Sequence, residues 1–337
     1  MGITDLNSIL NEVPHTMKVS LTDFRGKRIA IDASMWMYAN ISICQKEYIT
    51  KMPDPLQPID REAIINTCKG ILVKFISRFC KYGITLVFVW DGKPFPEKEI
   101  YRKLKRSKDK ERQLDKISEL RVKLESSHPL ARLPSEIKAY KDALCRHVQI
   151  TAQEIKMMRL FIENAGIPSI ISPNEAEKLC SALAQEGIVM GVWSTDTDNY
   201  IFGAPLIILG FDGYHEGIEC VKISLLGYIL HGLSLTHEQL VDLAIMLECD
   251  FNKRMTRIGP KTILPLIKEH KSIEKIMEVQ PHWPWDMLNH IRCREIFRYE
   301  PSNIDGTTLY IKGGEIDYPE LKNALQCVMK PSNCEFK

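Results

Sequence analysis

Residues 85–92 read TLVFVWDG, a short apolar and β-branched run that stops at an acid and a glycine. Such a run predicts a buried strand. Four further runs of this kind cover Arg28 to Ile31, Ser169 to Ile171, Val189 to Trp193 and Leu206 to Leu209. Stretches with helical periodicity alternate with these runs. The alternation predicts an α/β fold, with a mostly parallel central sheet flanked by helices.

Acidic residues follow three of these predicted strands. Asp32 comes after the first strand, Asp91 after the second, and Asp196 and Asp198 after the run that ends at Trp193. In an open α/β sheet the carboxyl ends of the strands face the ligand crevice. We therefore expect these acids to converge, although they are far apart in the sequence.

Three more acids complete a set of seven. Glu175 and Glu177 follow a turn at residues 173–174 that leads into a helix. Residues two apart on a helix point about 200° away from each other, so both reach one site only near the start of the helix. Asp250 follows the apolar helix predicted over Leu240 to Leu247.

Several carboxylates in one crevice repel each other and raise one another's pKa unless a cation neutralises them. Hard oxygen ligands suit Mg²⁺ or Mn²⁺ rather than zinc. Each acid alone has an ordinary explanation, as a turn former at a strand end or a solvated helix residue. The set of seven favours a metal site.

The formal net charge is only +2, but charge is unevenly distributed. Residues 93–123 contain twelve basic and six acidic residues. This segment has a helical pattern with a thin apolar face, which predicts a projecting arch. Charged helices are usually solvated faces. The position of this one directly after Asp91 favours a strand of DNA as its partner, with binding that falls steeply with salt.

Composition excludes several classes of protein. The longest apolar runs, such as Ile84 to Trp90, are far shorter than the roughly 20 residues that cross a bilayer, so we expect no membrane span. The N-terminus lacks the apolar region of a secretory signal. The ten cysteines are scattered without zinc spacing, which predicts reduced thiols in an intracellular compartment.

The short sequence motifs around the acids resemble those of the structure-specific 5′-nuclease family, which includes flap endonucleases, XPG-type repair nucleases and 5′ exonucleases. The matching stretches occur in family order: MGI at 1–3, IDASM at 31–35, VWDGKP at 89–94, PNEAE at 173–177, TDTD at 195–198, FG at 202–203 and IGPK at 258–261. The stretches FGAP at 202–205 and EHKSIE at 269–274 look most like the flap endonuclease branch.

The resemblance implies a 5′ flap endonuclease with 5′ to 3′ exonuclease activity that hydrolyses branched DNA with two Mg²⁺ ions, for which Mn²⁺ substitutes. It assigns one ion to Asp32, Asp91, Glu175 and Glu177, and the other to Asp196, Asp198 and Asp250. Such ions orient and deprotonate water and stabilise the leaving oxygen.

The resemblance also assigns residues that contact DNA. Lys98 and Arg106 match basic residues that contact the scissile phosphate. The spacing here is one residue longer than in the family, so Lys105 is an alternative to Arg106. Tyr38 matches an aromatic residue that stacks on a terminal base, and the alternative is a tyrosine of the core. Gly2 matches an amino terminus that lies near the acids.

Residues 258–261 match a helix-two-turn-helix that grips duplex DNA and binds K⁺. Gly259 begins a helix whose free N–H groups hold phosphate, and Lys261 lies beside it. The alternative is an ordinary turn before a helix. Arg257 replaces the glycine usual in the family, which makes K⁺ binding doubtful and adds a phosphate contact.

From these patterns we expect five segments: a nuclease region at 1–96, a basic arch at 97–135, a second nuclease region at 136–222, a helical DNA-binding subdomain at 223–300, and an extension at 301–337 without an assigned role. The expected partner is branched or flapped DNA, bound by a monomer. Nothing matches a sliding-clamp-binding peptide.

The family places the protein in the nucleus, while a viral or organellar origin fits the same sequence. Two other functions stay open at this point. One is an exonuclease or gap nuclease of the same family, and the other is a catalytically silent protein that binds DNA junctions.

Overall fold

The computed structural model describes residue 3 and residues 5–253, 255 and 258–309. This part of the chain forms two compact units. The first contains residues 3–33, 79–101 and 170–309, and the second contains 34–78 and 102–169. All seven candidate acids belong to the first unit.

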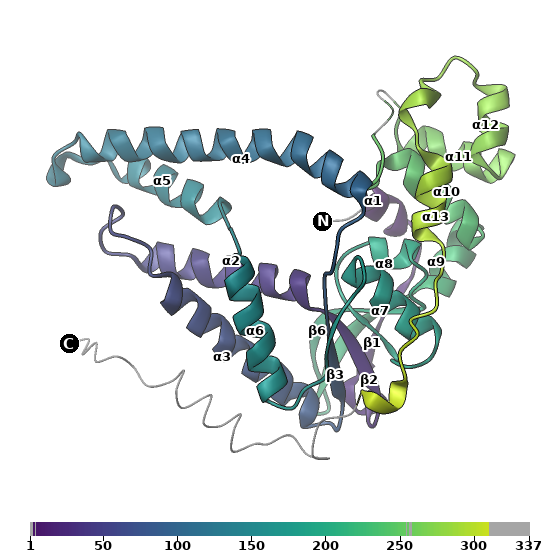
Figure 1. Ribbon diagram of the computed structural model, residues 1–337, viewed down its shortest axis with the longest axis horizontal. Coiled ribbons are helices and arrows are strands. Elements are labelled where there is room, and N and C mark those ends of the chain that lie inside the picture. The colour runs from purple at the N-terminus through teal and green to yellow at the C-terminus, as the bar shows by residue number, and fades with distance from the viewer. Residues whose placement is uncertain (1–2, 4, 254, 256–257, 310–337) are drawn as a thin grey trace. The chain divides into compact units, whose positions relative to one another are not determined.

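A seven-stranded sheet forms the centre of the first unit (Figure 1). Its strands are β1 (Thr16–Ser20), β2 (Arg28–Asp32), β3 (Thr85–Trp90), β4 (Ser169–Ile171), β5 (Gly191–Trp193), β6 (Leu206–His215) and β7 (Ile218–Leu225). Their order is β1-β7-β6-β5-β2-β3-β4. The central strands β6, β5, β2 and β3 are parallel, whereas β7 runs antiparallel to both β6 and β1. The predicted α/β fold is confirmed.

All five predicted strands are present, but β1 and β7 were not anticipated. Strand β1 is short and exposes its first three residues, so its sequence carries no apolar run. Strand β7 pairs with β6, which continues to His215 through two irregularities in the register. This antiparallel edge makes the sheet mixed rather than uniformly parallel.

The helices of the first unit pack against the sheet and against each other. They are α1 (Leu6–Leu10), α7 (Ala176–Gln185), α8 (Asp198–Ile201), α9 (Leu226–Leu233), α10 (His237–Leu247), α11 (Pro260–His270), α12 (Ile273–Val279) and α13 (His290–Phe297). Short 3₁₀ turns occur at Leu21–Phe24, Trp285–Met287 and Gly306–Thr308. Helix α7 lies on the centre of the sheet, where Leu183 shares one apolar core with Val89 of β3 and Val192 of β5. Burial of this core fixes the start of α7 relative to the strand ends.

An ion-pair network centred on the buried Asp242 joins three of these helices. Asp242 of α10 accepts hydrogen bonds from Arg294 of α13 at 2.6 and 2.7 Å. Its carboxylate also accepts from the backbone N–H of Ile273 at 3.1 Å, where α12 begins. Arg294 in turn pairs with Glu274 of α12. These interactions fix the positions of helices α10, α12 and α13 relative to one another.

Residues 299–309, here called the C-terminal strap, return to the sheet. Glu186, at the end of α7, accepts hydrogen bonds from Tyr299 Oη at 3.0 Å and from the Ser302 backbone N–H at 2.6 Å. Arg28 of β2 donates to the carbonyl oxygens of Ile188 and Gly306. Hydrogen bonds therefore attach the C-terminal strap to the end of α7 and to β2.

The second unit is helical. It contains α2 (Ala33–Lys51), α3 (Arg61–Cys80), α5 (Pro134–Arg146), α6 (Ala152–Asn164) and most of α4 (Pro96–Glu125), which begins in the first unit, with a 3₁₀ turn at Pro129–Ala131. The long helix predicted for the arch is confirmed as α4. Helix α5 runs back beside its end, joined by the ion pair of Lys123 with Glu136 at 2.8 Å (Figure 1). Within the described residues, no helix is both long and apolar enough to cross a membrane.

Candidate active site

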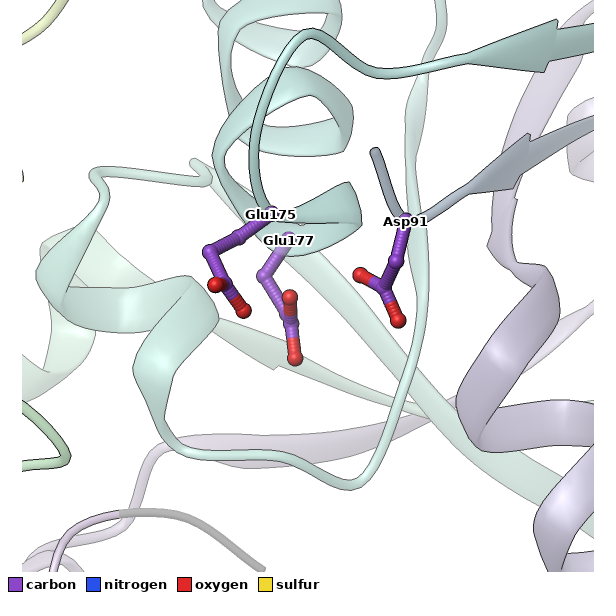
Figure 2. A group of neighbouring side chains, drawn as sticks. All are labelled: Asp91, Glu175 and Glu177. Carbon is purple, nitrogen blue, oxygen red and sulfur yellow. The ribbon is translucent and has the colours of Figure 1, made fainter. Parts of the chain in front are cut away.

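Three of the predicted acids lie together at the carboxyl edge of the sheet. Asp91, Glu175 and Glu177 each present an oxygen within 4.8 Å of the oxygens of the other two. Figure 2 shows their carboxylates pointing toward a common point, with Asp91 at the end of β3 and the two glutamates at the start of α7. Carboxylates so close together favour the binding of a hard divalent cation.

The loop after β3 lies directly against the chain that precedes α7. The backbone N–H of Gly92 donates to the carbonyl oxygen of Asn174 at 2.7 Å. A Cβ atom at Gly92 would lie 1.9 Å from the carbonyl oxygen of Ser172. Only glycine permits this approach, which places Asp91 beside Glu175.

The start of α7 orients the acids. Glu175 is the N-cap residue, and Glu177 lies in the first turn, as the sequence predicts. Asp91 accepts a hydrogen bond from the backbone N–H of Ala176 at 2.9 Å, so it satisfies a free donor of the helix. The positive end of the helix dipole also stabilises these negative charges.

Asp32, Asp196 and Asp198 are buried at neighbouring strand ends. Asp32 is the last residue of β2. After β5, Ser194 Oγ accepts from the backbone N–H of Asp196 at 3.0 Å, and Asp196 Oδ1 accepts from that of Asp198 at 3.2 Å. Asn199 Nδ2 also donates to Ser194 Oγ at 3.0 Å, which closes the turn.

Asp250 is carried by a strained turn after α10. Glu248 has a φ of 105°, in the region that favours glycine. Asn252 stabilises this turn, because its side chain accepts from the backbone N–H of Cys249 at 3.3 Å and donates to the carbonyl oxygen of Ile245 at 2.9 Å. The side chain of Glu248 is therefore accommodated at a cost in backbone strain.

Lys98, in the first turn of α4, joins the acids to one another. Its ammonium pairs with Glu175 and lies 3.3 Å from Asp250 Oδ2. Burial disfavours the charged ammonium, but the carboxylates of Glu177, Glu175 and Asp250 outweigh that effect and raise the pKa of Lys98. Lys98 therefore stays charged beside the acids.

The remaining charge in the site is poorly compensated. Burial, and then the charge of Asp32, raises the pKa of Glu177 well above its ordinary value. Burial also raises the pKa of Asp198, to which Asp196 and Asp250 contribute. Burial likewise raises the pKa of Asp196, although the hydrogen bond from Asp198 opposes the shift. These effects connect six of the acids, all except Glu175, through mutual repulsion, while Glu175 is joined to the set by Lys98.

The donor set fits a divalent cation. Within the described part of the chain, Glu177 Oε2 and Asp198 Oδ1 are buried atoms that make no hydrogen bond. A buried carboxylate oxygen without a partner costs free energy unless a cation approaches it. One such atom lies among the acids assigned to each of the two predicted ions.

The predicted DNA-contacting residues have different environments. Tyr38 on α2 is 42% exposed, which excludes the interpretation as a core tyrosine. Gly259 is the N-cap of α11 and Lys261 is exposed in its first turn. The contacts of these three residues with DNA stay predictions.

Four other predicted contacts cannot be placed. Gly2 and Arg257 lie outside the described residues, although the backbone N–H of the nearby Ile3 donates to Thr197 Oγ1 at 3.0 Å, between two of the acids. Lys105 and Arg106 belong to α4, but their side chains also lie outside the described part.

Comparison with known proteins identifies the family. The XPG N-terminal domain matches residues 1–113 and the XPG I-region matches residues 166–250. Flap endonuclease 1 of Saccharomyces cerevisiae is 31% identical over 330 residues, which cover 93% of this chain and 78% of the yeast protein. The chain belongs to the XPG-type nuclease family that includes the flap endonucleases. Flap endonuclease 1 of Mycosarcoma maydis is 30% identical over 329 residues, covering 93% and 80% of the two chains.

Solved structures share the fold of this XPG-family chain. The catalytic core of Rad2 in complex with DNA substrate superposes with a TM-score of 0.58 at 20% identity, covering 99% of this chain and 88% of the other. Flap endonuclease-1 from Methanococcus jannaschii also gives 0.58, at 19% identity, covering 94% and 96%. The predicted fold and family are both confirmed.

Sequence reasoning missed several residues that shape this site. The resemblance pointed to Lys98 as a phosphate contact, but not to its ion pairs with Glu175 and Asp250. Ser194 and Asn199 flank the acids of the TDTD stretch, and their polar side chains next to a strand end were the available signal. Arg292, which pairs with Glu97 beside Lys98, carried no signal in the sequence.

Proposed function

We propose that this XPG-family chain is a metal-dependent 5′ flap endonuclease that hydrolyses phosphodiesters at branched DNA junctions. The observation that carries the proposal is the gathering of the Asp91, Glu175 and Glu177 oxygens within 4.8 Å, beside a lysine, Lys98, that pairs with Glu175. The yeast and M. maydis relatives are named flap endonucleases, which supports the same activity here.

Two groups of acids would hold two Mg²⁺ ions, or Mn²⁺ in their place. One group is Asp32, Asp91, Glu175 and Glu177, and the other is Asp196, Asp198 and Asp250. When bound, such ions activate water and stabilise the charge that develops on the leaving oxygen. The unpartnered oxygens of Glu177 and Asp198 support this assignment.

Lys98 would bind the scissile phosphate. Its ammonium is charged and lies among the acids, so it can exchange a carboxylate for a phosphate oxygen without leaving the site. A charged donor placed where negative charge develops stabilises the transition state. Arg106, or Lys105 in its place, would supply a second such donor from α4.

The other DNA contacts extend the proposal. The exposed ring of Tyr38 would stack on a base near the 5′ end, and Gly259 with Lys261 would hold a phosphate of the duplex at the start of α11. Gly2 and Arg257 complete the set, and K⁺ binding beside Arg257 is not part of the proposal. The five segments expected from the sequence would then act as nuclease core, arch and duplex-binding region of a nuclear monomer.

A cleavage panel tests the function. The purified chain with Mg²⁺ is incubated with a labelled 5′ flap, a nicked duplex, a blunt duplex and a 3′-tailed duplex. We expect cuts near the flap junction, none in EDTA, and none with Asp196→Ala. A 5′ flap that stays whole with both wild type and Asp196→Ala would contradict the proposal.

The same panel separates endonuclease from exonuclease activity. We propose that the chain also degrades 5′ ends stepwise, which would release mononucleotides from the nicked duplex. If the flap substrate gives a product longer than one nucleotide and the nicked duplex gives no product, the chain has endonuclease activity but no exonuclease activity. Tight junction binding without cleavage would instead favour the silent DNA-binding alternative.

A further inference from the structure

The first turn of α4 is held by ion pairs on two sides. Lys98 points to Glu175 and Asp250. The preceding residue, Glu97, pairs through Oε1 with Arg292 Nε of α13 at 2.7 Å. Adjacent residues on a helix point about 100° apart, so the two sets of ion pairs anchor this turn in different directions.

The Arg292 guanidinium is itself oriented. Its Nη1 donates to Glu295 Oε2, one turn farther along α13, at 3.0 Å. The planar guanidinium thus bridges Glu97 and Glu295. Burial opposes the charge on Glu97, but the hydrogen bond from Arg292, a backbone hydrogen bond and the charge of Arg292 together outweigh it and lower the pKa of Glu97. The pair therefore remains ionised.

An aromatic contact connects the same elements. Phe95, just before α4, packs edge to face on Phe251 with ring centroids 5.7 Å apart. Phe251 follows Asp250 directly and packs on Phe297 of α13 at 5.4 Å. Helix α13 therefore supports the root of α4 with an apolar contact through Phe251 and a polar contact through Arg292.

We propose that Arg292 is a positioning residue for Lys98. It does not touch the acids; it holds Glu97, and through Glu97 the backbone that carries Lys98. Lys98 must exchange a carboxylate for a phosphate oxygen during the reaction, and a fixed backbone keeps its ammonium within reach of both. The proposal rests on the proposed nuclease function of the same site.

Replacement of Arg292 tests this role. Arg292→Gln should lower kcat for 5′-flap cleavage about 10-fold with KM unchanged, because a small displacement of a catalytic group has a large effect on rate. Arg292→Lys should restore part of the activity, since lysine keeps the charge but not the planar bridge. Arg298→Gln removes the same charge from an exposed position at the end of α13 and should change neither constant.

Coupling to Lys98 distinguishes positioning from other roles. Glu97→Gln should reproduce the effect of Arg292→Gln, and the double variant should be no worse than either single variant. In a Lys98→Ala background, Arg292→Gln should lower the single-turnover rate no further. Melting temperatures of all variants would verify that they are folded.

Three results would overturn the proposal. One is an unchanged kcat for Arg292→Gln, and another is an equal decrease in the Lys98→Ala background. The third is a raised KM with a weaker salt dependence and unchanged kcat, which would make Arg292 a phosphate-binding residue. In each case the wild type still cleaves the flap, whereas an inactive wild type would refute the proposed function itself.

Discussion

Individual carboxylates in this site oppose folding and favour metal binding at the same time. Glu177 and Asp198 each keep a buried oxygen without a hydrogen-bond partner. Burial, and then repulsion from the neighbouring acids, raises the pKa values of both carboxyls. Stability and function therefore make opposite demands on these positions.

Glu177→Gln should stabilise the metal-free protein and abolish cleavage. The amide has the same shape without the charge, so we expect the free energy of unfolding to rise by about 1 kcal/mol or more at neutral pH. Urea unfolding in EDTA measures it. Mg²⁺ should raise the melting temperature of wild type more than that of Glu177→Gln. The exposed Glu278→Gln serves as a control that should match wild type in every respect.

The sign of the pH dependence follows from the direction of the shift. The folded pKa of Glu177 lies above its ordinary value of 4.5, so the folded state binds its proton more tightly than the unfolded state. This contribution to stability is present below pH 4.5 and is lost as pH rises through the folded pKa. The advantage of Glu177→Gln over wild type should therefore grow with pH and should not be largest in acid.

Gly92→Ala should damage the site through the backbone. Its new methyl group would lie 1.9 Å from the Ser172 carbonyl oxygen, so the loop after Asp91 would have to move. We expect a decrease of about 2 kcal/mol in unfolding free energy and a strong reduction of cleavage. Gly227→Ala on α9, where nothing lies within 4 Å, is the matched control and should be tolerated. Equal behaviour of the two variants would refute this account.

Among the elements of the fold, helices α10, α12 and α13 depend on the ion pairs of Arg294 with Asp242 and Glu274, which no sequence pattern predicts. Arg294→Met should destabilise the chain by about 3 kcal/mol, because it leaves the buried Asp242 carboxylate without its cation. Adding Asp242→Asn should recover much of that stability, since the amide oxygen still accepts from Ile273 N–H. Denaturant unfolding of the single and double variants provides the comparison.

The same network has a defined response to acid. The hydrogen bond from Arg294 lowers the pKa of Glu274 to about 2. Its stabilising effect is therefore present above pH 4.5 and is lost as pH falls toward 2. The acid dependence of unfolding between these values should weaken in Glu274→Gln, and an unchanged profile would contradict it.

Prediction from sequence succeeded where an element is buried and continuous. The strands that lead to Asp32 and Asp91 contain buried apolar runs, and the recurrence of acids at several strand ends, not any one acid, indicated the site. Strand β1 was not predicted because it has only five residues, of which the first three are exposed and only Met17 and Val19 are apolar, so it contains no apolar run. Lys98 was found by resemblance, but its pairing with a glutamate 77 residues away is a tertiary interaction that no local pattern encodes.

For the whole molecule, a net charge of +2 conceals a segment with a strong positive excess. Replacing the exposed Lys110 and Lys116 of α4 by Gln should weaken binding of a 5′-flap substrate and reduce its salt dependence. The slope of log affinity against log salt should fall by about 0.7 for each phosphate that the protein no longer neutralises. Lys74→Gln on α3 is an exposed control for the change in net charge. An unchanged slope would remove α4 from the DNA-binding surface.

The C-terminal strap couples the C-terminal helices of the first unit to its sheet. Because Arg28 and Glu186 hold residues that follow α13 in the sequence, helices α9 to α13 lie between two segments of the chain that are hydrogen-bonded to β2 and to the end of α7. Truncation of the chain after Phe297 would remove hydrogen-bond partners of both α7 and β2. On heating, the strands and the C-terminal helices of the intact protein should therefore unfold in a single transition. Transfer of these helices to another protein would have to include the C-terminal strap.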